Sequence, residues 1–262
     1  MALENLLRKT KNFAVAPLVG IALFSSPLCL KNNDPCVKKQ NEIVNQVSSA
    51  KTLESYTVDY DLGIYFLGIK LFSSDANFYF KKTEENGLVK EIMGAEGKYS
   101  EKYHGFLYAV ISKDAEPFET HSYTMNYTSE KFIDKADFYK DKIVFTKDGV
   151  EHTMPNDGRV GLQSMIKPLY TEDLYEGQVF NHKTFLEGKR YECTFYVHQE
   201  ETIKVKGKKV RAHYVTLKAV GDDFYKDPSA EIWVVKGKPH NKLVKIVLTP
   251  FVFTKLMIVS NP

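Results

Sequence analysis

The sequence has few of the residues that build metal centres and disulfide frameworks. Its 262 residues include only three cysteines, Cys29, Cys36 and Cys193, and no CxxC motif or Cys/His cluster with metal-ligand spacing. Three cysteines do not make a disulfide framework in a chain of this length, and structural zinc requires four converging ligands. We therefore expect no metal site and no cofactor. Cys193 could pair with Cys36 in an oxidising compartment, or act as a small buried apolar residue within an alternating strand pattern.

The usual motifs of enzyme active sites are also missing. No G-x-S-x-G elbow surrounds a serine, and Ser164 has no base beside it in the sequence. Gly158-x-x-Gly161 lacks the lysine and hydroxyl of a phosphate-binding loop. We predict that the protein is not an enzyme and has no catalytic residue, while its ligand-binding residues stay unknown from the sequence.

Histidines occur singly rather than in clusters. A lone histidine on a strand is usually solvated or hydrogen-bonded, because metal binding needs several converging ligands. His198 and His213 could face one another across a hairpin that turns at Gly207, with Glu200 and Glu201 nearby. The other histidines considered as candidates are His152, His182 and His240.

Charge of one sign is not in large excess. The chain has 36 basic and 33 acidic residues, which gives a net charge of +3, and the two signs are interspersed. Dedicated nucleic-acid-binding proteins usually show a strongly basic face, so no nucleic-acid partner is expected. Two lysine-rich turns, KGKK and KGKPHNK, are typical solubilising hairpin tips; they would favour contact with anionic lipid only if both lay at one end of a sheet.

The first thirty residues resemble an export segment. Arg8, Lys9 and Lys11 precede an uncharged apolar run over residues 13–30, the arrangement of a basic n-region and an h-region. The run is long enough to approach a membrane span, and no small-x-small cleavage site precedes the polar segment. We therefore expect residues 1–30 to be either a signal peptide or a membrane anchor. Cys29 lacks the small preceding residue of a lipidation site. Residues 31–52 form a polar linker, and a β domain is expected over 53–262.

Sheet-forming patterns dominate that domain. Phenylalanine and tyrosine number 17 and 16, and aromatic residues suit pleated, half-buried surfaces. Period-two alternation recurs from residue 56 onward, and residues 103–113 fit either a helix or a strand. Turns are predicted at residues 147–149, 187–188, 206–208 and 236–242. The pattern predicts an all-β fold, a curved antiparallel sheet or open β-barrel with one short helix.

The short helix is expected near residues 160–169. Turn formers at 156–158 precede it, and Pro168 should perturb or end it. The apolar residues expected along one side are Val160, Leu162, Met165, Ile166 and Leu169.

Four spaced blocks resemble a bacterial exported family catalogued as domain of unknown function 3108. The last block carries Ile232-Trp233, Pro239 and Val244-Lys245-Ile246; the others are YDLGIYFLGIK, GLQSMIKPLY and KVKGKKVRAHYVTL. The chain departs from the family at the helix, where Gly161 and Lys167-Pro168 replace an acidic and an arginine position. The resemblance implies a curved antiparallel sheet or open barrel similar in outline to lipoprotein carriers. It also implies a cell-envelope or periplasmic location, and no activity.

Two functions are compatible with this sequence. In one, the hollow of a curved sheet binds a lipid or other amphiphile, since wide barrels can hold a small ligand. In the other, the protein is a structural or assembly factor that binds an envelope protein or a polysaccharide-export partner. Both faces of residues 230–235 carry apolar side chains, so at least one face must be covered, and the short helix is a candidate cover. The aromatic residues Phe66, Phe78, Phe80, Phe195, Tyr214 and Trp233 are expected in the core.

Overall fold

The structure is a computed structural model. It describes residues 51–85, 88–100, 103–112, 120–127, 132–147, 149–186, 188–221, 229–238, 240–251 and 254–260. The export segment, most of the linker, Cys29, Cys36 and Pro239 therefore lie outside the described residues. No helix among those described is both long and apolar enough to cross a bilayer.

The described chain forms one antiparallel sheet of fourteen strands with a single helix. The first eight strands are β1 (Lys51–Phe66), β2 (Ile69–Glu85), β3 (Leu88–Ser100), β4 (Tyr103–Ser112), β5 (Thr120–Tyr127), β6 (Phe132–Phe138), β7 (Lys142–Lys147) and β8 (Val150–Pro155). Helix α4 (Leu162–Thr171) comes next, followed by β9 (Val179–Leu186), β10 (Lys189–Val205), β11 (Lys208–Gly221), β12 (Ser229–Val235), β13 (Lys242–Phe251) and β14 (Thr254–Ser260). The predicted all-β class is confirmed, and residues 103–112 are a strand.

The strand order is a meander opened at one seam. Except for β8 and β9, each strand pairs with its neighbours in sequence. Because β1 also pairs with β14, the order runs from β8 back to β1 and then from β14 back to β9. The two sheet edges, β8 and β9, are therefore consecutive in the chain. The segment between them contains α4 and is the only connection across the gap within the described chain.

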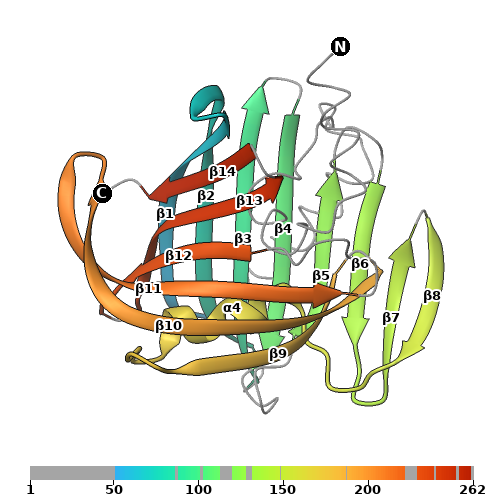
Figure 1. The fold of residues 1–262 in the computed structure, drawn as a ribbon. Coiled ribbons are helices and arrows are strands. Elements are labelled where there is room, and N and C mark those ends of the chain that lie inside the picture. Colours follow the sequence, from blue (N-terminus) through green and yellow to red (C-terminus); the bar gives the residue numbers. More distant parts are fainter. Residues whose placement is uncertain are drawn as a thin grey trace.

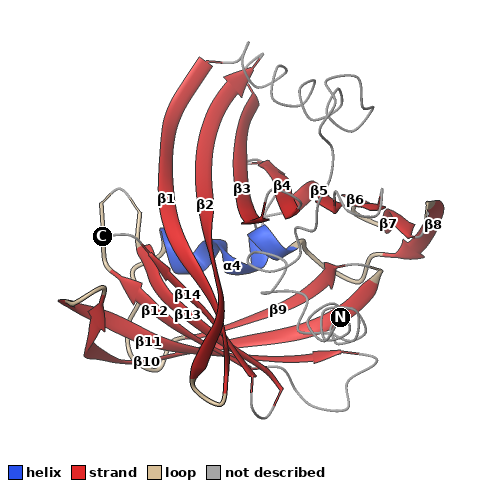
Figure 2. Cartoon of the chain, turned by 90° about the horizontal axis from the view of Figure 1, so that it is seen from above, coloured by secondary structure: helices blue, strands red, loops and turns tan. Residues whose placement is uncertain are grey.

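The sheet coils strongly along its length. Strands β1–β8 stand upright in Figure 1, whereas β9–β14 cross in front of them at a steep angle. Seen from above in Figure 2, α4 lies on the concave side, between the arc of β1–β5 and the layer of β9–β14. Accumulated strand twist produces this shape, and bulges such as those in β1 and β10 add local bends.

The tight turns follow their sequence signals. At the tip of β10–β11, Lys206 and Gly207 have φ angles of 46° and 84°, and Val205 pairs with Lys208 across them. Positive φ at both central residues is the geometry that matches strand twist in a two-residue hairpin. Lys147 likewise pairs with Val150, and Leu186 with Lys189. The turns predicted at these three places are confirmed.

Candidate functional site

Helix α4 depends on contacts with the rest of the protein, because the residues at its two ends give it little capping. Gly161 at its start makes no side-chain cap, and its last turn contains no basic residue. Three residues of the apolar side predicted from the sequence, Met165, Ile166 and Leu169, are buried. Ser164, Lys167 and Tyr170 are buried as well, whereas Val160 lies before the helix and is partly buried. Isolated helices of this length are unstable in water, and tertiary packing supplies most of their stability.

Pro168 lies inside the helix rather than at its end. It cannot donate the intrahelical hydrogen bond that its position would normally give to the carbonyl of Ser164. The helix nevertheless continues to Thr171, and the backbone N–H of Glu172 donates to the Pro168 carbonyl at 3.0 Å. Of the two predicted effects of Pro168, ending the helix is wrong, since burial of the helix outweighs one missing hydrogen bond.

A buried arginine fastens the segment before α4 to the sheet. The Arg159 side chain is 7% exposed and donates to the backbone carbonyls of Thr184 and Tyr191 at 3.4 and 3.2 Å. It also contacts Asp157 at 2.8 Å, and Asp157 accepts from Lys183 at 3.2 Å. Burial opposes ionisation of Asp157, but the Lys183 hydrogen bond and the Arg159 charge hold its pKa below the usual range.

The same segment covers part of the β9 edge. Val160 forms a parallel bridge with Thr184: the Val160 N–H donates to the Lys183 carbonyl at 2.9 Å, and the Phe185 N–H donates to the Val160 carbonyl at 3.1 Å. Unpaired edges invite association with other strands. One edge of the open sheet is thus partly occupied by the chain's own backbone.

Asn241 anchors the other end of the helix. Its amide nitrogen donates to the carbonyls of Leu169 and Glu172 at 3.2 and 2.6 Å, and its backbone N–H donates to the Tyr170 carbonyl at 2.8 Å. Carbonyls in the last turn of a helix have no intrahelical partner. Asn241, which lies in the connection between β12 and β13, supplies those partners and ties α4 to that turn.

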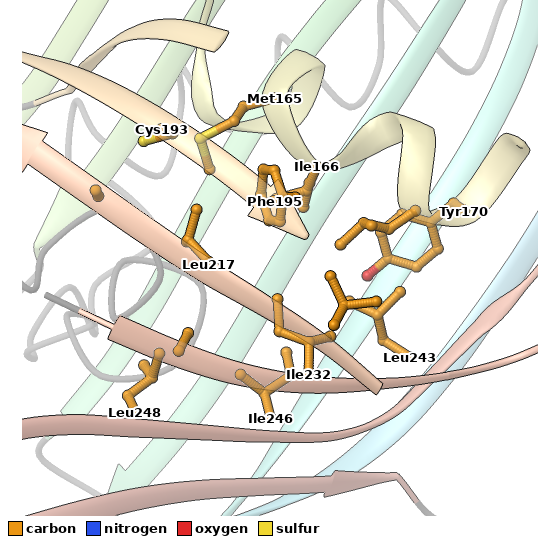
Figure 3. Close-up of a cluster of buried hydrophobic side chains, with 14 of the residues drawn as sticks. Met165, Ile166, Tyr170, Cys193, Phe195, Leu217, Ile232, Leu243, Ile246 and Leu248 are labelled. Carbon is orange, nitrogen blue, oxygen red and sulfur yellow. The ribbon is translucent and has the colours of Figure 1, made fainter. Parts of the chain in front are cut away.

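The concave face around α4 is packed with the protein's own side chains. Figure 3 shows Met165, Ile166 and Tyr170 of the helix directed toward side chains of the sheet. The labelled sheet residues of this cluster are Cys193, Phe195, Leu217, Ile232, Leu243, Ile246 and Leu248. The helix is therefore the cover that was expected for the face carrying Ile232.

Phe185 joins the two ends of the sheet. Its side chain is fully buried on β9, with its ring centroid 4.9 Å from that of Phe145 on β7 and 6.3 Å from that of Phe138 on β6, both in edge-on contact. Ala136 and Ile143 of the same wing are also fully buried in this cluster. The wing β6–β8 thus packs against the β9 side without pairing with it.

The opposite face of β10–β14 carries a second apolar cluster. It contains buried Val205, Ala212, Trp233, Val244 and Val247. The end of the β10–β11 hairpin bends out of line with the rest of the two strands (Figure 1) and contributes Val205 and Ala212 to this cluster. Lys206 at the tip contacts Asp61 of β1 at 2.5 Å. The second apolar face of the final strands is therefore covered in part by the hairpin.

A row of rings crosses this outer face. His198 stacks on Tyr214 with centroids 5.0 Å apart, Tyr214 lies 5.3 Å from Trp233, and the Lys245 ammonium lies 4.3 Å from the Trp233 centroid. The Trp233 indole N–H donates to Glu201. Burial and the hydrogen bond to Glu231 raise the pKa of Tyr214 to about 12. Trp233 is buried as expected, and Tyr214 is partly buried against it. Phe195 is fully buried in the concave cluster, also as expected.

The histidine pair does not form. A bulge in β10 between Val197 and Glu200 shifts the register, so that Glu200 faces His213 at 3.4 Å from carboxylate to imidazole. His198 instead contacts the Thr216 hydroxyl at 2.8 Å on the other face of the sheet. The expectation that His198 and His213 could face one another is therefore wrong, because one extra residue in a strand reverses which face its side chains reach.

The remaining candidates stand apart from one another. His152 stacks on Phe145, His240 contacts Glu54 at 2.7 Å, and His182 is mostly buried, which lowers its pKa. Ser164 is buried in α4. Within the described part of the chain, no three His, Cys, Asp or Glu side chains gather closely enough to hold a metal ion.

Cys193 is a buried core residue with a free thiol in the described structure. Burial raises its pKa to about 12. The side chains of Phe66, Phe78 and Phe80 lie outside those described, so their expected place in the core stays a prediction.

The two lysine-rich turns lie at the same end of their strands. In an antiparallel meander, alternate connections share one end, so the β10–β11 and β12–β13 turns are neighbours at the end where β1 begins. We call this surface the basic end. Its members are Lys204, Lys206, Lys208, Lys209, Lys236 and Lys238, all exposed.

Comparison with known proteins gives only distant similarities. No family model and no curated protein matches the chain, so the resemblance to domain of unknown function 3108 is not confirmed. A β-barrel-like protein of domain of unknown function 1849 from Brucella abortus is similar over 81% of this chain and 97% of its own, with 10% identity and a TM-score of 0.49. LprF from Mycobacterium bovis is similar over 90% and 93%, with 10% identity and a TM-score of 0.19. Both scores lie below 0.5, and neither similarity indicates a ligand or an activity.

Proposed function

We propose that this chain is a non-catalytic protein of the bacterial cell envelope that binds a lipid or other amphiphile on the concave side of its sheet. One observation carries the proposal: fourteen strands curve around a single helix of ten residues. Barrels of about eight strands are wide enough for their own side chains to fill, and larger ones enclose cavities or channels. A helix of this length, about 15 Å, fills only part of such an interior.

The chemistry of the concave face supports an apolar ligand. Most of the buried side chains that the sheet places around α4 are apolar or aromatic, with Thr184 and Ser260 as buried polar exceptions. An acyl chain beside this cluster would bury further apolar area, at about 25 cal/mol per Å². The basic end would stay near the polar head group of such a ligand.

The non-catalytic assignment rests on where the reactive side chains lie. Ser164 and Cys193 are buried, and burial raises the pKa of the Cys193 thiol and lowers that of His182, which disfavours the charged form of each. His213 is engaged with Glu200. The envelope location rests on the basic and apolar pattern of residues 1–30.

A second function is favoured by a different observation. The helix and the concave face of β9–β14 pack tightly together, as they would in a protein whose sheet is filled by its own side chains. In that case the protein is a structural or assembly factor, and its partner is an envelope protein or a polysaccharide-export component.

Native mass spectrometry with lipid extraction distinguishes the two functions. The full chain would be purified from its own membrane fraction and then tested for uptake of a fluorescent fatty acid. Stoichiometric co-purified amphiphile and saturable uptake are expected. A ligand-free protein that also fails to take up the probe would overturn the binding proposal and favour the assembly role.

Neighbouring residues on β1 provide a matched pair of variants. Val58 is buried in the concave cluster, whereas the adjacent Thr57 is exposed on the opposite face. Val58→Trp should reduce probe uptake because it fills the interior, and Thr57→Trp should leave uptake unchanged. Thermal unfolding checks that both variants fold, since overpacking costs roughly 1–3 kcal/mol. Equal uptake by both folded variants would place the ligand elsewhere.

A further inference from the structure

We propose that the basic end is the surface by which this protein docks on an anionic lipid bilayer. The inference concerns the outside of the molecule and does not depend on an amphiphile in the hollow. It starts from the distribution of charge among the connections of β9–β14.

Positive charge is concentrated in the connections at one end of these strands. The β10–β11 turn contains Lys206, and the β12–β13 connection contains Lys236 and Lys238. At the opposite end, residues 222–228 between β11 and β12 contain three aspartates and one lysine, and residues 187–188 and 252–253 contain no lysine. The basic residues in the strands beside these connections are Lys189, Arg190 and Lys255. Lysines that only keep a protein soluble need not gather at one end of the strands. Lysines that bind an anionic surface approaching from one side must face that side.

Both lysine-rich turns are fastened to β1 or to the helix. Lys206 contacts Asp61, and His240 contacts Glu54 at 2.7 Å, so both turns touch the same strand. Lys236 contacts Asp173 just after α4 at 2.6 Å. Because Asp61 and Glu54 are seven residues apart, their positions along β1 differ by about 23 Å. Lysines spread over that length suit an extended anionic surface better than a single small anion.

Several lysines of the basic end remain available for a partner. Lys204, Lys208, Lys209 and Lys238 are exposed, and none of them forms an ion pair with another described residue. The hairpin tip that carries three of them is packed through Val205 against the outer apolar cluster. The charges are therefore presented on a folded element whose position is set by the core.

The start of β1 lies at the same end. Tyr60 pairs with Ser260 and Phe66 with Thr254, so β1 runs from the basic end toward the opposite one, beginning at Lys51. The first described residue of the domain, Lys51, therefore lies at the same end as the lysine-rich turns. An apolar segment at residues 13–30 held in a bilayer would bring this end of the domain to the membrane surface.

Residue-resolved amine labelling of the full chain tests the proposal. The chain would be incubated with vesicles of phosphatidylcholine alone, or of phosphatidylcholine mixed with an equal amount of phosphatidylglycerol, and labelling of each lysine would be read by mass spectrometry. Lys204, Lys208, Lys209 and Lys238 should be protected only on the anionic vesicles, and raising the salt concentration should remove the protection. Lys70, Lys140 and Lys218 should label equally on both. Protection of those three instead, or equal labelling of all lysines on both vesicles, would overturn the proposal.

Charge-matched variants separate this surface from an effect of net charge. Lysines near an anionic membrane strengthen binding about fivefold each, so replacing Lys204, Lys208, Lys209 and Lys238 by Gln should weaken the phosphatidylglycerol-dependent binding by up to roughly several hundredfold. The control variant replaces Lys70, Lys140, Lys142 and Lys218 by Gln and should lose far less. Equal losses in the two variants would contradict a defined docking end. Vesicle binding is measured without added fatty acid, which keeps this test separate from that of the hollow.

Discussion

Replacing Phe185 tests whether the two ends of the sheet are held together by packing alone. Phe185 is fully buried and contacts Phe138 and Phe145, which belong to strands at the other end of the sheet. Removing a buried phenylalanine ring costs roughly 3–5 kcal/mol, and aromatic pairs contribute about 0.5–1.5 kcal/mol beyond their buried area. We expect Phe185→Ala to lower the free energy of unfolding by about 3–5 kcal/mol and the Tm by roughly 6–20 °C.

The matched control is Tyr196→Ala on the adjacent strand. Tyr196 is a strand residue of similar size whose side chain is 43% exposed, so its loss should cost less than about 1 kcal/mol. Chemical denaturation gives the free energies, and amide hydrogen exchange shows where the structure loosens. In Phe185→Ala, exchange should rise first in β6–β8, because no backbone ladder joins this wing to β9.

The reasoning fails if Phe185→Ala costs no more than Tyr196→Ala. It also fails if exchange rises equally in all strands, because the wing would then depend on contacts other than this ring. The loss in the free energy of unfolding for Phe185→Leu should lie between those of the two alanine variants, since leucine keeps part of the buried apolar volume.

Three further predictions concern single groups. Asn241→Leu leaves the Leu169 and Glu172 carbonyls without their side-chain donor, so it should lower the free energy of unfolding by about 2–4 kcal/mol. Amide hydrogen exchange should increase most in helix residues 162–171. Burial raises the pKa of the Cys193 thiol from 9.0 to about 12. The contribution of the neutral thiol to the free energy of unfolding is therefore complete below pH 9 and is lost as the pH rises toward 12. Cys193→Val should abolish this loss when unfolding is measured as a function of pH. The folded thiol should also resist iodoacetamide at pH 8 until denaturant is added. Burial lowers the pKa of His182 below 6.5. The contribution of the neutral imidazole to the free energy of unfolding is therefore present above pH 6.5 and declines as the pH falls below that value. If His182→Gln loses stability below pH 6.5 in the same way as the unmodified chain, this prediction is wrong.

Much of the strand pattern could be predicted because it depends on neighbours in sequence. Alternation in β10 and β11 placed Cys193 and Phe195 on a buried face, and the structure buries both. Lys206-Gly207 indicated a tight turn because its backbone needs positive φ at both positions. The apolar residues of α4 indicated one buried side of the helix, but not that Ser164 and Lys167 are buried too.

The site-building contacts could not be predicted in the same way, because they join distant parts of the chain. Arg159 meets the carbonyl of Tyr191, 32 residues away, and Asn241 meets that of Leu169, 72 residues away. No local pattern marks an arginine or asparagine as a buried donor. The bulge after Val197, which sends His198 and His213 to opposite faces, also has no clear signal in the residues that form it.

The sequence by itself determined the β class, the hairpin turns, the short helix and the need to cover both faces of residues 230–235, because alternation and turn geometry are local properties of the backbone. Only the tertiary structure decided what covers them: α4 on the face of Ile232 and the end of the β10–β11 hairpin on the face of Trp233. It also brought the two lysine-rich turns to one end, beside the start of β1. Those arrangements depend on strand order, register and accumulated twist, which are set by packing between residues far apart in the chain.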